Sequence, residues 1–433
     1  MWNYIADVGM PSFPISFDEP HRHETFFLSP SHQQHLSQLL DFLHLISSPI
    51  SLFLLSLAPK HLYPAIHYII KMVSFVAQAS LIGLSCLPAL VSAAPFSFPL
   101  SNGFPNITAP SNQLTIIQNK AHGSLPNGGP PANITANTLT SLQLIAFNEL
   151  SEVAFFTELI SNVTNNVEGY KIQDGATRRF VLETLKNVQA QEELHALNAN
   201  NAVNHFSKNP IQACQYNFPV SNFEDAITLA STFTDVVLGT LQDVVTLFGE
   251  DGDSGLIRGV ASVIGQEGEQ DGYYRSIQGK LPSALPFLTA STREFAFSAL
   301  NQLFVVPNSC PNSNIINLPV FGALSVLTTP DVIVDSQKVS FMVDATTTNW
   351  PSGSSTPLSL VYINQQNTPV VQQIENIKVE GTTVTFDAAF PFSKGTFGNG
   401  LTIAAVTKTS GPFASVDAVA QDTLFGPGLI EIN

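Results

Sequence analysis

Between residues 136 and 305, apolar side chains recur every three or four positions, which is the period of α-helices that pack through one face. The pattern predicts helices at about residues 138–161, 176–206, 223–249, 256–279 and 291–305. The last helix is expected to begin with a capping box, because Ser291 is followed three residues later by Glu294. Residues 136–305 are therefore predicted to form a bundle of four or five helices.

After residue 330 the apolar period changes to two, as in half-buried strands. Residues 339–344, 358–363 and 377–386 alternate in this way, and clusters of Gly, Pro, Asn and Ser bound them. A domain of this size and pattern is typical of an antiparallel sandwich. The predicted architecture is multidomain α plus β: the helical bundle, a Pro- and Asn-rich connector at 306–330, and a small β-sandwich-like domain at 331–433.

The residues before the bundle carry targeting and linker signals. Residues 72–93 join an apolar stretch to a small-x-small cleavage pattern, which is typical of a secretory signal peptide. We expect translation to begin at Met72, so that residues 1–71 are an upstream extension, disordered or absent from the mature protein. The alternative is that the N-terminal apolar segments are retained and hold the protein in a membrane. Residues 94–135 are rich in Pro, Asn, Gly and Ser and are predicted to be a linker.

The composition fits a protein that is secreted or bound to the cell wall. The net charge is −16, so the chain lacks the basic surface that neutralises nucleic-acid phosphates, and no nucleic-acid partner is expected. Three Asn-x-Thr triplets predict N-glycosylation at Asn106, Asn133 and Asn162. Cys86 lies in the signal peptide, which leaves Cys214 and Cys310 either as a disulfide, the pairing we expect in an oxidising compartment, or as unrelated thiols.

Charged residues stand inside the apolar stripes of three predicted helices. Glu192 and His195 form a Glu-x-x-His, whose spacing places both side chains on one helix face, about one turn apart. Glu149 and Glu267 occupy stripe positions in the same way. Burying a charge is costly unless it is paired or bound to a metal. These residues are therefore candidate metal ligands, whereas the flanking acids Glu152, Glu193 and Glu269 are expected to face solvent or to precede Arg or Lys partners on their helices.

Four motifs resemble the ferritin-like domain family and, within it, fungal late sexual development and starvation-stress proteins, which are related to plant desiccation-associated ferritin-like proteins. The motifs lie at 148–156, 191–195, 234–241 and 266–274, so that the resemblance covers about residues 136–305. It implies a four-helix bundle whose helices supply two Glu and two Glu-x-x-His to a di-metal site. The corresponding positions here are Glu149, Glu192, His195, Asp235, Glu267 and Gln270.

Two of these positions depart from the family pattern. Gln270 stands where a histidine is expected, and Asp235 stands where a longer glutamate is expected. Imidazole is a far better transition-metal ligand than a glutamine amide. At most one metal position, for iron or manganese, is therefore expected, made by Glu149, Glu192 and His195 with Glu267 bridging. The alternative is a degenerate site, in which the carboxylates hold protonated His195 and Gln270 by hydrogen bonds.

Three functions stay open at this point. The resemblance implies a secreted protein of stress response or sexual development, and we favour a non-enzymatic role with a degenerate carboxylate site. A second possibility is an iron or manganese oxidoreductase that uses the bundle carboxylates and His195. A third is a cell-wall or glycan-binding module in the β domain, where Trp350 and Tyr362 are the candidate aromatic residues. No feature of the sequence specifies an oligomeric state.

Overall fold

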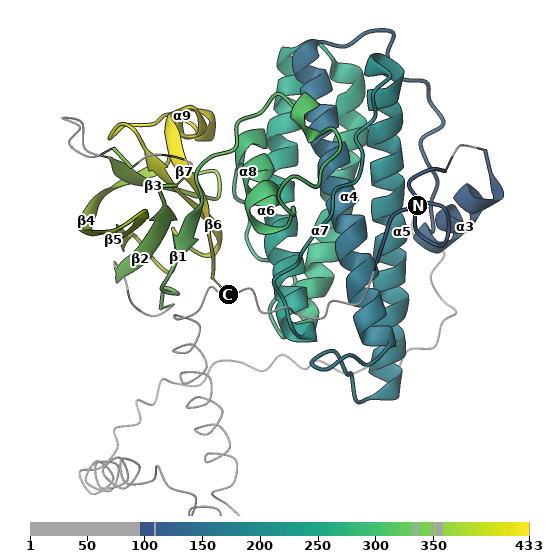
Figure 1. Cartoon of the computed structure of the whole chain (residues 1–433), viewed down its shortest axis with the longest axis horizontal. Coiled ribbons are helices and arrows are strands. Elements are labelled where there is room, and N and C mark those ends of the chain that lie inside the picture. The colour runs from purple at the N-terminus through teal and green to yellow at the C-terminus, as the bar shows by residue number, and fades with distance from the viewer. Residues whose placement is uncertain are drawn as a thin grey trace, which may run out of the picture. The chain divides into compact units, whose positions relative to one another are not determined.

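We describe the chain from a computed structural model (Figure 1). The structure describes residues 96–107, 110–331, 334, 337–346, 348, 350, 351 and 358–432. The upstream extension at 1–71, the signal peptide at 72–93 and Cys86 lie outside the described residues. Among the helices that are described, none combines the length and the hydropathy needed to cross a membrane.

The helical domain contains all five of the expected helices, and their ends lie within a few residues of the predicted positions. Its elements are α3 (Asn112–Ala121), α4 (Ala136–Thr164), α5 (Gly175–Ser207), α6 (Phe223–Glu250), η4 (Ser254–Leu256), α7 (Ile257–Ile277), α8 (Arg293–Leu303) and η5 (Ser313–Ile315). Side chains cap three of the long helices at their first turns, which satisfies backbone N–H groups that have no partner within the helix. These caps are Thr135 for α4, Asp174 for α5 and Asn222 for α6.

The start of α8 differs from the expected capping box. The helix begins one residue later, with Thr292 as the N-cap, and the Thr292 hydroxyl makes no capping hydrogen bond. Instead, the backbone N–H of Arg293 donates to Oδ2 of Asp243, on α6, at 3.1 Å. A carboxylate from a neighbouring helix has therefore replaced the local cap, because α6 and α8 pack side by side.

The helix α3 is absent from the sequence prediction, since it lies within the predicted linker at 94–135. Its N-cap Ser111 accepts from the N–H of Leu114, and its apolar side packs against α5 through Leu114 and Ile117. The preceding segment buries Phe104 in the same core. This part of the expected linker therefore belongs to the packed helical domain.

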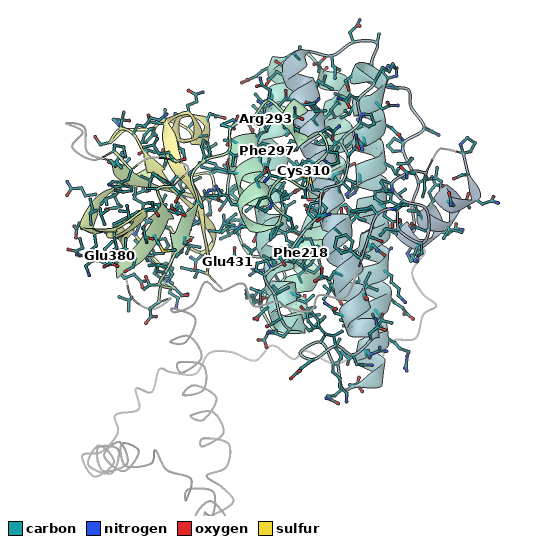
Figure 2. All side chains as sticks on the ribbon, viewed as in Figure 1. Phe218, Arg293, Phe297, Cys310, Glu380 and Glu431 are labelled. Carbon is teal, nitrogen blue, oxygen red and sulfur yellow. A yellow bond between two sulfur atoms is a disulfide. The ribbon has the colours of Figure 1, made fainter. Side chains whose placement is uncertain are left out.

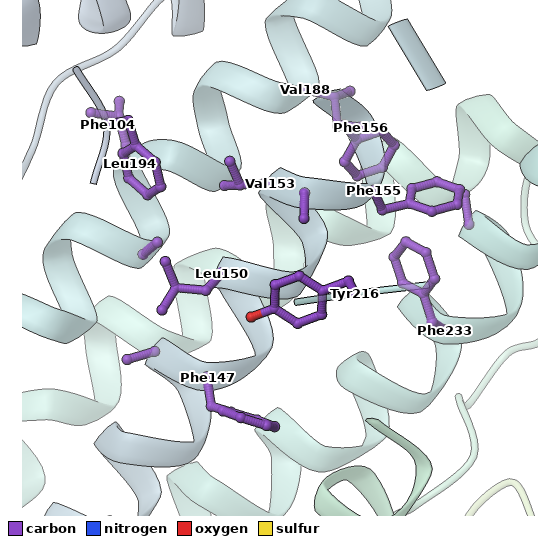
Figure 3. Packing of buried hydrophobic residues seen from close by; sticks show 14 of the residues in the cluster. Phe104, Phe147, Leu150, Val153, Phe155, Phe156, Val188, Leu194, Tyr216 and Phe233 are labelled. Atoms are coloured by element: carbon purple, nitrogen blue, oxygen red, sulfur yellow. The ribbon is translucent and has the colours of Figure 1, made fainter. Parts of the chain in front are cut away.

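Aromatic side chains fill the centre of the bundle. The ring of Phe155 on α4 contacts those of Phe156 and Phe233, with centroids 5.2 and 5.1 Å away, and these two rings are 6.2 Å from each other (Figure 3). Phe218, in the α5–α6 connection, is 5.1 Å from Phe155 and extends the cluster. Every residue of α4 from 146 to 156 is buried, because α5, α6 and α8 surround this stretch. Polar residues in the middle of α4 are therefore inside the protein whichever way they point.

The C-terminal β domain is antiparallel, as predicted, but its strands form one sheet rather than two stacked sheets. Its elements are β1 (Leu324–Val326), β2 (Gln337–Asp344), β3 (Ser359–Asn364), β4 (Val370–Glu380), β5 (Thr383–Phe390), β6 (Gly400–Thr407), α9 (Val416–Asp422) and β7 (Thr423–Ile432). The strand order is β1-β2-β5-β4-β3-β6-β7. The sheet is nearly closed, because β1 at one edge also contacts β7 at the other.

Two local features bend this sheet. The alternating run at 377–386 is a hairpin rather than one strand, with Gly381 at φ +64° in the two-residue turn between β4 and β5. Residues 370–373 of β4 pair with β3 and the following residues pair with β5, and a β-bulge between Glu375 and Lys378 interrupts the pairing with β5. Bulges increase the local twist and bend of a strand. The bulge therefore bends β4 along its pairing with β5.

The β domain packs against the α6 and α8 side of the bundle (Figure 1). Val236 of α6 and Phe295 of α8 share an apolar cluster with Val361 of β3 and Ile403 of β6. The amide of Gln302 donates to the backbone oxygens of Phe321 and Gly426 at 2.9 and 3.0 Å. Apolar packing and specific hydrogen bonds thus join the two domains.

The predicted disulfide is confirmed. Cys214, in the α5–α6 connection, is bonded to Cys310, which follows α8 (Figure 2). The bond closes a loop with a sequence separation of 96 residues. Disulfides persist in oxidising compartments, so this bond is consistent with an extracellular location.

Candidate metal centre

Three helices bring four metal-ligating side chains to one point inside the bundle. Glu149 comes from α4, Glu192 and His195 come from α5, and Glu267 comes from α7. One ligand atom from each lies within 4.8 Å of every other. We refer to these four residues as the carboxylate–histidine group. Their convergence is what the Glu-x-x-His spacing and the stripe positions predicted.

The imidazole of His195 faces all three carboxylates through Nδ1. Its distances are 2.9 Å to Oε2 of Glu192, 3.6 Å to Oε2 of Glu149 and 3.8 Å to Oε1 of Glu267. The three glutamates are at most 1% exposed, whereas the His195 side chain is 16% exposed. The three carboxylates are therefore enclosed by the protein, and the edge of the imidazole is the part of the group that reaches solvent.

Several carboxylate oxygens of the group have no hydrogen-bond partner. They are Oε2 of Glu149 and both oxygens of Glu267, and all three are buried. A buried polar atom left unsatisfied costs about 1–3 kcal/mol, and more when it is charged. A divalent cation between these oxygens and Nδ1 of His195 would satisfy them together. The donor set of carboxylates with one imidazole fits manganese or iron, since carboxylates suit manganese and imidazole suits iron.

The protonation of the group follows from its burial. Burial raises the pKa of Glu149 from 4.5 to about 7, against the opposing effect of His195. Burial, and then the charges of Glu149 and Glu192, raise the pKa of Glu267 well above 4.5. Burial lowers the pKa of His195, but the adjacent carboxylates outweigh it, so that its pKa lies well above 6.5. In the absence of a metal the group therefore retains protons at neutral pH, and a metal ion would have to displace them.

Gln270 lies beside this group without joining it. Its Nε2 donates to Oε1 of Glu192 at 2.6 Å and to Oε1 of Gln191 at 3.2 Å. The amide of Gln266 donates to the same Gln191 oxygen at 3.1 Å. The residue at the expected histidine position thus orients Glu192 by a hydrogen bond and links α7 to α5.

Asp235 belongs to a second cluster of charges, away from the carboxylate–histidine group. Burial, and then the charge of Asp271, raise the pKa of Asp235 to about 7, against the opposing charge of Arg275. Glu431, near the end of β7, faces the same charges from the β domain (Figure 2). Asp235, the expected ligand from the third helix, therefore lies among charges at the junction between the two domains.

Two of the acids expected to face solvent are buried instead. Glu152 is 4% exposed, and its Oε1 accepts from Asn148 at 2.9 Å. Glu193 accepts two hydrogen bonds of 3.0 Å from Asn102, in the segment before α3. The one sequence signal for Glu152 is its i+3 position after Glu149, which puts it near the same face of α4. Glu269 is exposed, as predicted.

The three predicted glycosylation positions differ in accessibility. Asn106 and Asn133 are exposed. Asn162, in the last turns of α4, is only 3% exposed. A glycan needs open space around the amide nitrogen, and the buried Asn162 offers less of it than the two exposed positions.

A comparison with protein families agrees with the helical architecture. The family model of the ferritin-like domain matches residues 130–280. This segment is a ferritin-like domain. It runs from just before α4 to just after α7 and contains the whole carboxylate–histidine group. The β domain lies outside the match. No curated protein matches the chain.

Proposed function

We propose that the ferritin-like domain binds one transition-metal ion, iron or manganese, through the carboxylate–histidine group. The observation that carries this proposal is the convergence of Glu149, Glu192, His195 and Glu267 around three buried carboxylate oxygens that have no partner. A network built only to hold His195⁺ would be expected to aim those oxygens at donors. Here only Glu192 lies within hydrogen-bonding distance of the imidazole.

The same geometry supports one metal position rather than two. The amide of Gln270 is engaged with Glu192 and Gln191, and Asp235 faces Asp271 and Arg275. The ligands for a second ion that the ferritin-like pattern would supply are therefore occupied elsewhere. We infer a single ion with an outer hydrogen-bond layer from Gln270, which fixes the orientation of Glu192.

The residues around the group would hold and shield the ion. Tyr274 and Phe156 are fully buried beside it, and their rings stack at 6.0 Å. The partly exposed His195 leaves one approach from solvent. An iron or manganese ion bound there would supply one-electron redox chemistry.

We further propose that the mature protein is secreted, as an extracellular or wall-associated protein. Three observations support this: the disulfide, the signal-like segment at 72–93, and the exposed triplets at Asn106 and Asn133. A role in stress response or sexual development is supported by the resemblance of the four helix motifs. This role predicts that the protein is expressed under starvation or during fruiting, which transcript measurements can check.

The metal proposal is tested by elemental analysis of the secreted protein, before and after anaerobic reconstitution with Fe²⁺ or Mn²⁺. Glu267→Gln removes a ligand charge with little change in shape, and Glu269→Gln is the matched control, because Glu269 is exposed two residues away on the same helix. We expect about one ion per chain in the wild type and the control, and none in Glu267→Gln. An absence of metal from the reconstituted wild type would leave the carboxylates as a degenerate network and refute the proposal.

A further inference from the structure

A cleft of about 510 Å³ lies between the helical bundle and the β domain. Ligand pockets commonly have volumes of about 300–1,000 Å³ and often lie at domain interfaces. The walls come from α6, α8, the segment before β1, the end of β6, α9 and β7. None of the four residues of the carboxylate–histidine group lines it, so this cleft is a separate feature of the molecule.

The cleft contains a buried carboxylate that is only partly satisfied. The side chain of Asp243 is 9% exposed, and its Oδ2 accepts from the backbone N–H of Arg293. No described residue donates a hydrogen bond to its Oδ1. The guanidinium of Arg293 is directed to Asn137 and Ser141 of α4, and its Nε is 3.9 Å from Asp243. Asp243 is therefore left with an open acceptor in the wall of the cleft.

The surroundings of Asp243 are acidic. Burial raises the pKa of Asp243 to about 7, the hydrogen bond and charge of Arg293 oppose this, and the carboxylates of Glu294 and Asp417 raise it further. Both of these acids line the cleft, one from α8 and one from α9. Lys408 also lines the cleft and is exposed. The carboxylates thus outnumber the cations that face the cleft.

Apolar side chains form the rest of the surface. Leu247 of α6 and Leu424 of β7 line the cleft from its two sides, and Phe321 and Val320 come from the segment between them. Val320 is 49% exposed and adds apolar surface to the wall of the cleft. An apolar chain that covered Val320 would remove this surface from water.

We propose that the cleft binds a basic side chain of a peptide partner: an ammonium or guanidinium group that contacts Asp243, on an apolar stem that lies along Val320, Leu247 and Leu424. The positive group would satisfy Oδ1 of Asp243 and relieve the repulsion among the three carboxylates. The stem would cover the exposed valine. An anion is disfavoured here by Glu294 and Asp417.

Proton release is a consequence of this arrangement. Asp243 carries a proton in a substantial fraction of molecules at pH 7, and a bound cation favours its ionised form. Affinity should therefore rise between pH 6 and pH 8. Arg293, Glu294, Asp417 and Lys408 are the other charged groups that line the cleft around Asp243.

The test is calorimetric titration of the full chain with n-hexylammonium, which carries a cation on an apolar stem, beside n-hexanol, n-hexanoate and a neutral trisaccharide. Asp243→Asn keeps an oxygen that can accept from the N–H of Arg293 but removes the charge. We expect it to weaken hexylammonium binding about ten-fold. Lys408→Met removes a competing cation, and we expect about two- to three-fold tighter binding. Glu183→Gln, an exposed acid on α5, is the control and should bind like the wild type.

The opposite effects of Asp243→Asn and Lys408→Met distinguish a cation site from general unfolding, because a misfolded variant could only lose affinity. Equal binding of hexanol and hexylammonium would overturn the proposal and leave an apolar groove. Preferred binding of hexanoate, or of the trisaccharide alone, would overturn it in favour of an anion or glycan site. Absence of binding of all four probes at millimolar concentration would also refute it.

Discussion

Glu267→Gln should stabilise the metal-free protein at neutral pH while it abolishes metal binding. Glu267 is 1% exposed, and neither of its oxygens has a hydrogen-bond partner. Its pKa is raised well above 4.5 by burial and by the nearby Glu149 and Glu192. The folded protein must therefore retain a proton that the unfolded chain releases, and glutamine is a neutral substitute that needs no proton.

The size and the sign of the effect follow from proton linkage. A carboxyl with a raised pKa contributes stability that is present below the unfolded pKa and is lost as the pH rises through the folded pKa. Between the unfolded value of 4.5 and pH 7, this loss is at most about 3.4 kcal/mol, at 1.36 kcal/mol per pH unit. The advantage of Glu267→Gln over the wild type should therefore be small at pH 4.5 and largest near neutral pH.

Urea denaturation of metal-stripped protein at pH 4.5 and pH 7, with the disulfide intact, measures this difference. Glu269→Gln is the control and should match the wild type at both pH values, because Glu269 is exposed. Added metal at 100 times its dissociation constant should stabilise the wild type by about 2.7 kcal/mol and leave Glu267→Gln unchanged. If Glu267→Gln is instead less stable than the wild type at pH 7, ionised Glu267 supports the fold through His195. The degenerate-network hypothesis would then be correct.

Three further predictions concern other parts of the molecule. Metal affinity should fall steeply from pH 8 to pH 6, because the ion displaces protons held by raised-pKa groups such as Glu149; a titration that is flat with pH would contradict this. Asp235→Asn should stabilise the protein at pH 8, and the gain should shrink as the pH falls to 4, because the pKa of Asp235 is raised to about 7. Thermal unfolding at pH 8 and pH 4 measures this difference. A gain in stability that does not depend on pH would count against the prediction. Phe155→Ala should lower the unfolding free energy by about 3–5 kcal/mol, because the Phe155 ring is buried among phenylalanines. Phe180→Ala, at an exposed position, should change the unfolding free energy by less than about 0.5 kcal/mol. Denaturant midpoints of the two variants test this difference.

The sequence alone determined the elements and one edge of the site. A period of three to four predicted the long helices, because a helix buried through one face must repeat its apolar residues at that interval. The Glu-x-x-His spacing placed Glu192 against His195 before any tertiary information, since i and i+3 side chains meet on any α-helix. Their separation of 2.9 Å is the part of the site that local geometry fixes by itself.

Where a helix is apolar on every side, the periodicity of its apolar residues cannot show which residues face the carboxylate–histidine group. Asp235 lies on α6, an apolar helix that packs against both the bundle and the sheet, and the β domain brings Glu431 towards it. Glu152 lies in the stretch of α4 that is buried on all sides, so its exposure could not be inferred from periodicity. Only the packing of neighbouring elements decided the environment of these two acids.

Local motifs also failed where a distant residue supplied a better partner. The capping box at Ser291 did not form, because Asp243 of α6 accepts from the N–H of Arg293. The alternating run at 377–386 became a hairpin, because Gly381 adopts a positive φ that most residues avoid. The sequence therefore predicted the long helices, the change to strands after residue 330 and the four residues of the carboxylate–histidine group. The tertiary structure decided which of those residues meet, because burial and charge act between segments that lie far apart along the chain.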